Sequence, residues 1–201
     1  NGLALTGYIQ SLPAPSITST LTASGTVGSA FTYATSATNS PSSYSATGLP
    51  SGLSINTTTG AISGTPTVAG TFNVSLSATN GTGTDTKTLV ITVAQANQVI
   101  TFNTLSGKTY GDASFSLNGT SNSGLALTYS SSNTAVATIS GNTVTIVGAG
   151  STTITASQAA DATHFGDSIS ATLTVNAVSV LTNNGQISTT DFNYINKNIY
   201  K

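Results

Sequence analysis

Residues that could perform acid–base chemistry are few in this sequence of 201 residues. Its single histidine, His164, lies between Asp161 and Asp167 in a chain that is rich in serine. A Ser-His-Asp triad also needs a nucleophile on a tight turn and an oxyanion hole, and no motif typical of either is present. We therefore interpret His164 as a residue of a loop over residues 157–167. We predict no catalytic residues, no cofactor and no enzymatic activity.

Carboxylates that could bind a metal ion are equally sparse. Ca²⁺ takes several oxygen ligands, and Asp161 and Asp167 could supply two of them beside backbone carbonyl oxygens. Residues 94–98, which join the two halves of the chain, contain no acid, so a calcium site that stiffens this joint is not expected. We predict no metal site, with a lone site at Asp161 and Asp167 as the alternative.

A lysine and an acid near residue 87 suggest a different chemistry, the Lys-Asn isopeptide crosslink of some bacterial surface domains. Such a crosslink needs a buried lysine and a buried acid that promotes the reaction. Lys87 shares strand parity with Leu89 and Ile91, and Asp85 is close in sequence. Both residues fall where a strand begins and exposure is the usual outcome, so we interpret them as exposed and keep the crosslink as an alternative.

The composition excludes several classes of partner. Charged residues make up 4% of the chain, there is no Arg, Glu or Cys, and the net charge is -1. Nucleic-acid binding and attraction to anionic membranes both need clustered cations, which four scattered lysines do not provide. No run approaches the roughly 20 apolar residues of a membrane helix. We expect neither nucleic-acid binding nor membrane insertion, and no disulfide can form.

Short alternating runs separated by turn residues predict an all-β fold. In residues 71–80, Phe72, Val74 and Leu76 alternate with hydroxylated residues, and residues 89–93 repeat the pattern after a glycine-containing loop. The pattern restarts near Val99, and each half holds about seven short strands, as in an immunoglobulin-like sandwich. We predict two tandem immunoglobulin-like β-sandwiches, over residues 12–95 and 97–176, with short extensions over residues 1–11 and 177–201.

Four motifs of the first half resemble the dystroglycan-type cadherin-like repeat of the putative-immunoglobulin family. They are LPSGLSI at 49–55, TGAISGTP at 59–66, AGTF at 69–72 and ATNGTG at 78–83. We interpret their glycines and Pro66 as turn residues, because Gly supplies positive φ and Pro fixes its own φ.

The second half resembles the bacterial immunoglobulin-like repeats of adhesins. The matching motifs are KTYGD at 108–112, SSNTAVA at 131–137, VGAG at 147–150 and TTITA at 152–156. Lys108 and Asp112 belong to the first of these motifs, and we expect them to form a local structural pair. Both resemblances imply large, secreted or cell-surface proteins of bacteria and sometimes of phages.

The two extensions contain the residues that we predict to take part in self-association. Leu3, Leu5 and Ile9 share one parity of an isolated strand candidate. Residues 178–181 could form an additional strand, and a helix capped by Thr190 would place Phe192, Ile195 and Ile199 on one face. These segments are interpreted either as linkers to neighbouring domains or as strands that add to an open sheet edge of another subunit.

The predicted function is structural: a non-catalytic module of an extracellular bacterial surface adhesin, stalk or self-assembling fibre. The expected partners are the protein itself or neighbouring repeats. One alternative is a module that binds carbohydrate or a host surface through loops at the sandwich tip. The aromatic residues that could stack on sugars are Phe31, Tyr33, Tyr44, Phe72, Phe102 and Tyr129, although most alternate as core residues do. A decoration or tail domain of a phage virion is a further alternative.

Overall fold

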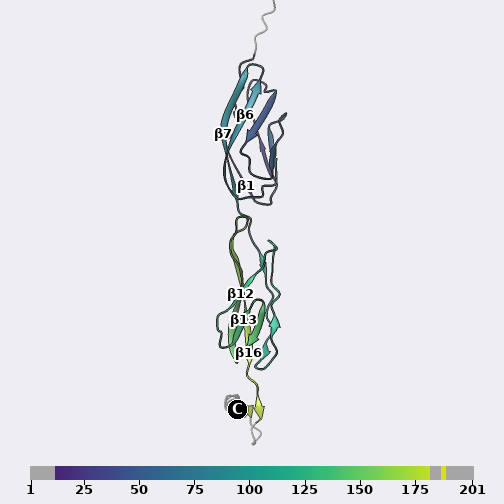
Figure 1. Ribbon diagram of the computed structural model, residues 1–201, viewed down its shortest axis with the longest axis vertical. Helices are drawn as coiled ribbons and strands as arrows, with labels where there is room; N and C mark the ends of the chain where they lie inside the picture. The colour runs from purple at the N-terminus through teal and green to yellow at the C-terminus, as the bar shows by residue number, and fades with distance from the viewer. Residues whose placement is uncertain (1–11, 182–186, 189–201) are drawn as a thin grey trace, which may run out of the picture. The chain divides into compact units, whose positions relative to one another are not determined.

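A computed structural model describes residues 12–181 and 187–188 of the chain (Figure 1). Two compact units divide it at Asn97 and Gln98, with Ala162–His164 grouped with the first unit. The described residues contain no helix, and none of them forms a helix that could span a bilayer. The predicted helix that begins at Thr190 lies outside the described residues. The all-β prediction is confirmed.

The first sandwich consists of seven strands in two sheets. One sheet has the order β1-β7-β6-β3 and the other the order β2-β5-β4. The strands are β1 (Thr22–Thr26), β2 (Phe31–Ala34), β3 (Ser43–Thr47), β4 (Leu53–Ile55), β5 (Ala61–Gly64), β6 (Gly70–Asn80) and β7 (Gly83–Ala94). The longest pairing is the β6–β7 hairpin, in which Gly70 pairs with Val93 and Asn80 with Gly83 (Figure 1).

The second sandwich has a related layout but nine shorter strands, where the sequence predicted about seven. Its larger sheets have the orders β12-β15-β16-β9 and β10-β14-β13, and β11 pairs with β8. The strands are β8 (Ile100–Thr101), β9 (Lys108–Thr109), β10 (Phe115–Ser116), β11 (Thr120–Ser121), β12 (Thr128–Ser131), β13 (Ala137–Ser140), β14 (Thr143–Ile146), β15 (Gly150–Gln158) and β16 (Asp167–Asn176). The additional strands arise because residues 102–107 and 117–119 interrupt the pairing.

A two-stranded ribbon follows the second sandwich. Its strands β17 (Val180–Leu181) and β18 (Ile187–Ser188) pair in antiparallel fashion. The sequence suggested a strand near residues 178–181, and β17 lies there.

The core of each sandwich is formed by the inward parity of its strands. Val74, Leu76 and Leu89 are completely buried in the first sandwich, and Ile154 and Leu173 in the second. Burying a side chain of this size stabilises the fold by about 1.5–3 kcal/mol. Alternation therefore fixes which face of each strand points inward, because a slip of one residue would turn the apolar set towards solvent.

Gly52 and Gly64 allow the backbone to cross itself closely in the first sandwich. Both have positive φ, +90° and +138°, and a Cβ at Gly52 would lie 2.0 Å from the Thr65 carbonyl oxygen. The Thr65 N–H donates to the Gly52 carbonyl over 3.1 Å. This contact explains why the two motifs at 49–55 and 59–66 need glycine at these positions.

We expect Gly52→Ala to destabilise the protein by about 2–5 kcal/mol, because it combines positive-φ strain with a backbone overlap. Gly28→Ala is the matched control, since Gly28 has φ +76° and nothing within 4 Å of the added Cβ. It should cost only about 1–2 kcal/mol from the strain alone. Urea unfolding of both variants measures the difference, and equal losses would contradict the role of the close approach.

Candidate functional site

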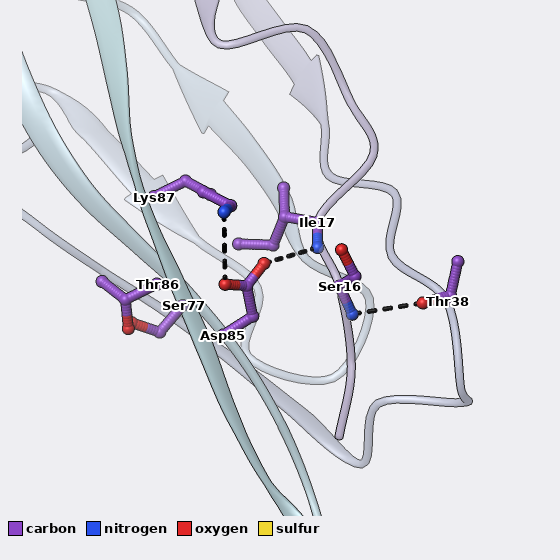
Figure 2. A network of polar contacts seen from close by, with 7 residues as sticks. All are labelled: Ser16, Ile17, Thr38, Ser77, Asp85, Thr86 and Lys87. Carbon is purple, nitrogen blue, oxygen red and sulfur yellow. Dashed lines mark hydrogen bonds and ion pairs between the residues drawn. The ribbon is translucent and has the colours of Figure 1, made fainter. Parts of the chain in front are cut away.

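Asp85 lies at the start of β7 and holds the segment that enters the first sandwich (Figure 2). Its Oδ2 accepts a hydrogen bond from the Ile17 backbone N–H at 2.8 Å, and its Oδ1 lies 3.6 Å from Lys87 Nζ. The Asp85 side chain is 20% exposed, against 44% for Lys87. A charge-assisted hydrogen bond in such a partly buried place is stronger than a neutral one, so the bond to Ile17 is the principal contact of Asp85.

Ser16 and Ile17 also hold the entering segment on the side opposite Asp85. Thr38 N–H donates to the Ser16 carbonyl at 2.9 Å. Ser16 N–H donates in turn to Thr38 Oγ1 at 3.2 Å (Figure 2). Ile17 forms a bridge with Ala37 and buries its side chain in the core. The entering segment thus contacts the β2 side of the sandwich through its backbone and the β7 side through Asp85.

The contact with Asp85 sets the register of the first strand on the last. Ile17 and Asp85 are 68 residues apart in the sequence. The parallel pairing of β1 with β7 keeps this separation from Thr22 and Val90 through to Thr26 and Ala94. We call the carboxylate of Asp85 and its bond to Ile17 the first latch.

Asp167 forms the corresponding second latch. It is the first residue of β16, whereas Asp85 lies near the start of β7, and each acid precedes the last buried valine, Val93 or Val175, by eight residues. Asp167 Oδ2 accepts from the Ile100 N–H at 3.4 Å, and its Oδ1 accepts from the Ser168 N–H at 2.8 Å. These two roles of Asp85 and Asp167 were not predicted from the sequence. The available signal was an acid on the inward parity of a strand, which needs a hydrogen-bond partner.

Lys87 lies in a setting that does not suit an isopeptide crosslink. Its side chain is nearly half exposed and its ammonium group pairs with Asp85, whereas the reaction needs a buried, neutral amine. The prediction that Lys87 is exposed is therefore correct, whereas Asp85, which was also expected to be exposed, is mostly buried.

The described contacts of His164 and Asp167 are with other residues and not with each other. His164 Nδ1 lies 2.8 Å from Thr163 Oγ1, and Asp167 is used in the second latch. Among the residues that the structure describes, no three His, Asp, Glu or Cys side chains lie close enough together to hold a metal ion.

Lys108 and Asp112 do not contact each other as the predicted pair. Lys108 Nζ lies 4.8 Å from the centre of the Phe115 ring, a cation–π contact. Asp112 accepts the Thr109 N–H at 2.9 Å and closes the turn after β9. The prediction was wrong because the turn directs each side chain to a different partner.

The six aromatic residues considered for sugar stacking all pack against the two cores instead. They are Phe31, Tyr33, Tyr44 and Phe72 in the first sandwich and Phe102 and Tyr129 in the second. Phe102 and Tyr129 contact each other with ring centroids 5.9 Å apart. These rings do not form an exposed platform.

Hydroxylated side chains cover the outer face of the sheet β1-β7-β6-β3. Ser77 and Thr86 are hydrogen-bonded across the hairpin at 2.8 Å, as are Thr79 and Thr84. The outward residues of β3, Ser43, Ser45 and Thr47, continue this face and are exposed. Cross-strand hydroxyl pairs stabilise a sheet without charge, which explains how a chain with so few ionic groups stays polar outside.

The residues predicted to take part in self-association lie outside the described residues. They are Leu3, Leu5, Ile9, Phe192, Ile195 and Ile199. Their participation stays a prediction.

We expect Asp85→Ala to destabilise the first sandwich by about 1–3 kcal/mol, because the partly buried Ile17 N–H loses its acceptor. Lys87→Ala is the control for the ion pair and should cost less than about 1 kcal/mol, as exposed pairs do. Urea unfolding of both variants compares the two losses. A larger loss for Lys87→Ala would show that the ion pair, and not the bond to Ile17, is what Asp85 contributes.

Two family models match the chain in tandem. Residues 14–94 match the family described as "Putative Ig domain", and residues 112–160 match the intimin immunoglobulin-like domain. No curated protein matches the sequence.

Several solved structures resemble the chain. A putative alpha-galactosidase of Bacteroides fragilis is 32% identical over 41% of this chain, with a TM-score of 0.40, and this chain covers 18% of it. Human protocadherin-24 EC1-2 is 14% identical over 83% of this chain and all of its own, with a TM-score of 0.43. A SusE-like surface-located polysaccharide-binding protein of Bacteroides thetaiotaomicron is 16% identical over 87% of this chain and 36% of its own, with a TM-score of 0.37.

Immunoglobulin-like domain families of the two matched kinds are typically non-catalytic. Their order on one chain agrees with two sandwiches that each fold around a separate core. Residues 14–94 thus match a Putative Ig domain and residues 112–160 an intimin-type immunoglobulin-like domain, and this tandem order supports bacterial immunoglobulin-like repeats.

Proposed function

We propose that this chain is a structural segment that withstands tension in an extracellular bacterial adhesin, stalk or self-assembling fibre. The observation that carries the proposal is the parallel pairing of the first strand with the last in the first sandwich. β1 pairs with β7 over five residues, from Thr22 and Val90 to Thr26 and Ala94. The match to an intimin domain supports a location at the cell surface.

Parallel pairing of this kind suits a segment under tension. The chain enters the first sandwich beside Asp85, at the start of β7, and leaves it after Ala94, at the other end of the same strand. Tension between these points pulls β1 and β7 along each other in opposite directions. All of their hydrogen bonds, and the first latch, are then loaded together and not one after another.

Surface chemistry supports association with other copies or neighbouring repeats. Natural sheets discourage edge pairing with charged residues, above all Lys, and this chain has four lysines in 201 residues. Its net charge of -1 gives little mutual repulsion. We propose that residues 3–9, through Leu3, Leu5 and Ile9, take part in this association, and that Phe192, Ile195 and Ile199 form a second contact.

Electron microscopy and light scattering of the 201-residue chain, beside a variant that lacks residues 1–10, test the association. We expect filaments or oligomers of the full chain and a monodisperse variant, because the deletion removes Leu3, Leu5 and Ile9. Monodisperse particles from both proteins at all concentrations would overturn self-assembly and leave a passive stalk or a tip-binding module.

Single-molecule pulling between residues 1 and 201 tests the mechanical role. The second sandwich should unfold at the lower force, because β9 pairs with β16 at only two residues, Lys108 and Thr109, and forced unfolding follows the unfolding rate. Asp85→Ala should lower only the higher of the two forces, which assigns that event to the first sandwich. If Asp85→Ala lowers the weaker event, the proposed order is wrong.

A further inference from the structure

Residues 102–107 of the second sandwich lie beside β16 and do not form a strand. We call this segment the strap; the residues on either side of it keep one constant register relative to β16. At one end of the strap, Ile100 N–H is bonded to Asp167, 67 residues away. At the other end, Lys108 pairs with Val175, which is again 67 residues away. The strap therefore spans the same number of residues as the facing stretch of β16.

The strap nevertheless leaves the edge of β16 open. β16 pairs with β15 from Asp167 to Val175, but its other edge pairs with β9 only at Val175 and Asn176. Within the described part of the chain, no backbone partner joins that edge over residues 168–174. A cavity of about 470 Å³ lies there, lined by Phe102, Thr104 and Leu105 of the strap and by Ser170, Ala171 and Thr172 of β16.

Two apolar residues of the strap prevent it from pairing. Phe102 and Leu105 are both partly buried against the core, yet they are three residues apart. Alternate residues of a strand point to opposite faces, so a regular strand could direct only one of them inward. The first sandwich has no such conflict, because Leu21 O accepts the Val90 N–H and β1 then pairs over five residues.

The open edge also leaves inward-facing residues of β16 uncovered. Ile169 and Ala171 share the parity of the buried residues Leu173 and Val175. Ile169 is 37% exposed and Ala171 is partly exposed. In a two-sheet sandwich these positions belong to the core, and a strand added at this edge would cover them.

We propose that this edge of β16 is an acceptor site for residues 3–9 of a second copy of the chain, an inference that rests on the proposed self-association. The open stretch and residues 3–9 are each seven residues long, about 23 Å as a strand. Leu3, Leu5 and Ile9 share one parity, and Ala4, Thr6 and Tyr8 the other. If the added strand runs parallel to β16, as β9 does, and Leu5 lies opposite Ala171, then Leu3 covers Ile169, the apolar parity fills the cavity, and the strap moves outwards.

A charged residue lies at each end of the acceptor site. Asp167 lies at one end, held by the second latch, and Lys108 at the other, where its ammonium group contacts Phe115. Residues 1–10 carry no charged side chain, so they suit the uncharged stretch between these two residues. Charged side chains discourage edge pairing, which restricts the added strand to the length of the gap.

The test compares Ala171→Lys with Ser170→Lys in the full chain. Ala171 lies on the inward parity of β16, whereas the hydroxyl of Ser170, on the opposite parity, is bonded to Thr155 Oγ1 of β15, so the two variants add the same charge to opposite faces of the same strand. Ala171→Lys should weaken self-association measured by light scattering at least about tenfold, since burying an unpaired charge costs more than the 1.4 kcal/mol that a tenfold change represents. Ser170→Lys should associate as the unmodified chain does.

A crosslink locates the partner segment independently of these variants. The chain has no cysteine, so mixing full chains that carry Leu5→Cys with full chains that carry Ala171→Cys should give a disulfide-linked dimer on oxidation. Chains that carry Ser170→Cys in place of Ala171→Cys should give no such dimer, because the side chain of residue 170 points away from the added Leu5. A fluorescent peptide of residues 1–10 provides a third probe of the full chain.

The outcomes separate the acceptor site from self-assembly itself. Assembly that Ala171→Lys leaves unchanged, without the crosslink, overturns the acceptor site while self-assembly stands. If the chain does not assemble but binds the peptide, and Ala171→Lys weakens that binding, then the acceptor site stands and the fibre is overturned. Neither assembly nor peptide binding by the unmodified chain overturns both.

Discussion

Closure of each sandwich depends on joining its first segment to its last strand by backbone hydrogen bonds. The chain has no cysteine, so no disulfide can tie the two sheets together. An aspartate at the start of the last strand, Asp85 or Asp167, accepts the N–H of Ile17 or Ile100 instead. This bond sets the register at one end, and the parallel pairing at the other end of the strand maintains it.

The pairing of the first segment with the last strand differs between the two sandwiches, and this difference gives them different mechanical and binding properties. In the first sandwich, five residues of β1 pair with β7 after the latch. β1 therefore covers the edge of β7 beside its buried residues. In the second, Phe102 and Leu105 compete for the core and hold the strap away from β16. A single conflict between side-chain packing and strand alternation thus turns a closed edge into an open one. The closed joint suits resistance to tension, and the open one suits addition of a strand.

Hydroxyl pairs connect neighbouring strands on the described surface of both sandwiches. Pairs such as Ser77 with Thr86, and Thr155 with Ser170, are bonded at 2.8 Å across neighbouring strands. Such contacts are much less sensitive to salt than ion pairs between exposed residues. Four of the charged side chains that the structure describes have specific local roles: Asp85 and Asp167 form latches, Asp112 closes a turn, and Lys108 covers Phe115.

The sequence by itself determined the fold class, because alternation with a period of two marks strands locally and glycine with positive φ marks their turns. It predicted the long hairpin from residues 71–93, and it expected positive φ at Gly60 and Gly64, where the φ angles are +73° and +138°. Gly64 is nevertheless the last residue of β5 and not a turn residue, because it pairs with Phe31 and Leu53. Only the tertiary structure decided what the acids and the strap do. The latches and the β9–β16 pairing join residues 67 or 68 positions apart, and no local pattern reports a contact over that distance. Lys108 and Asp112 show the same limit at short range, because proximity in sequence did not determine which partner each side chain meets.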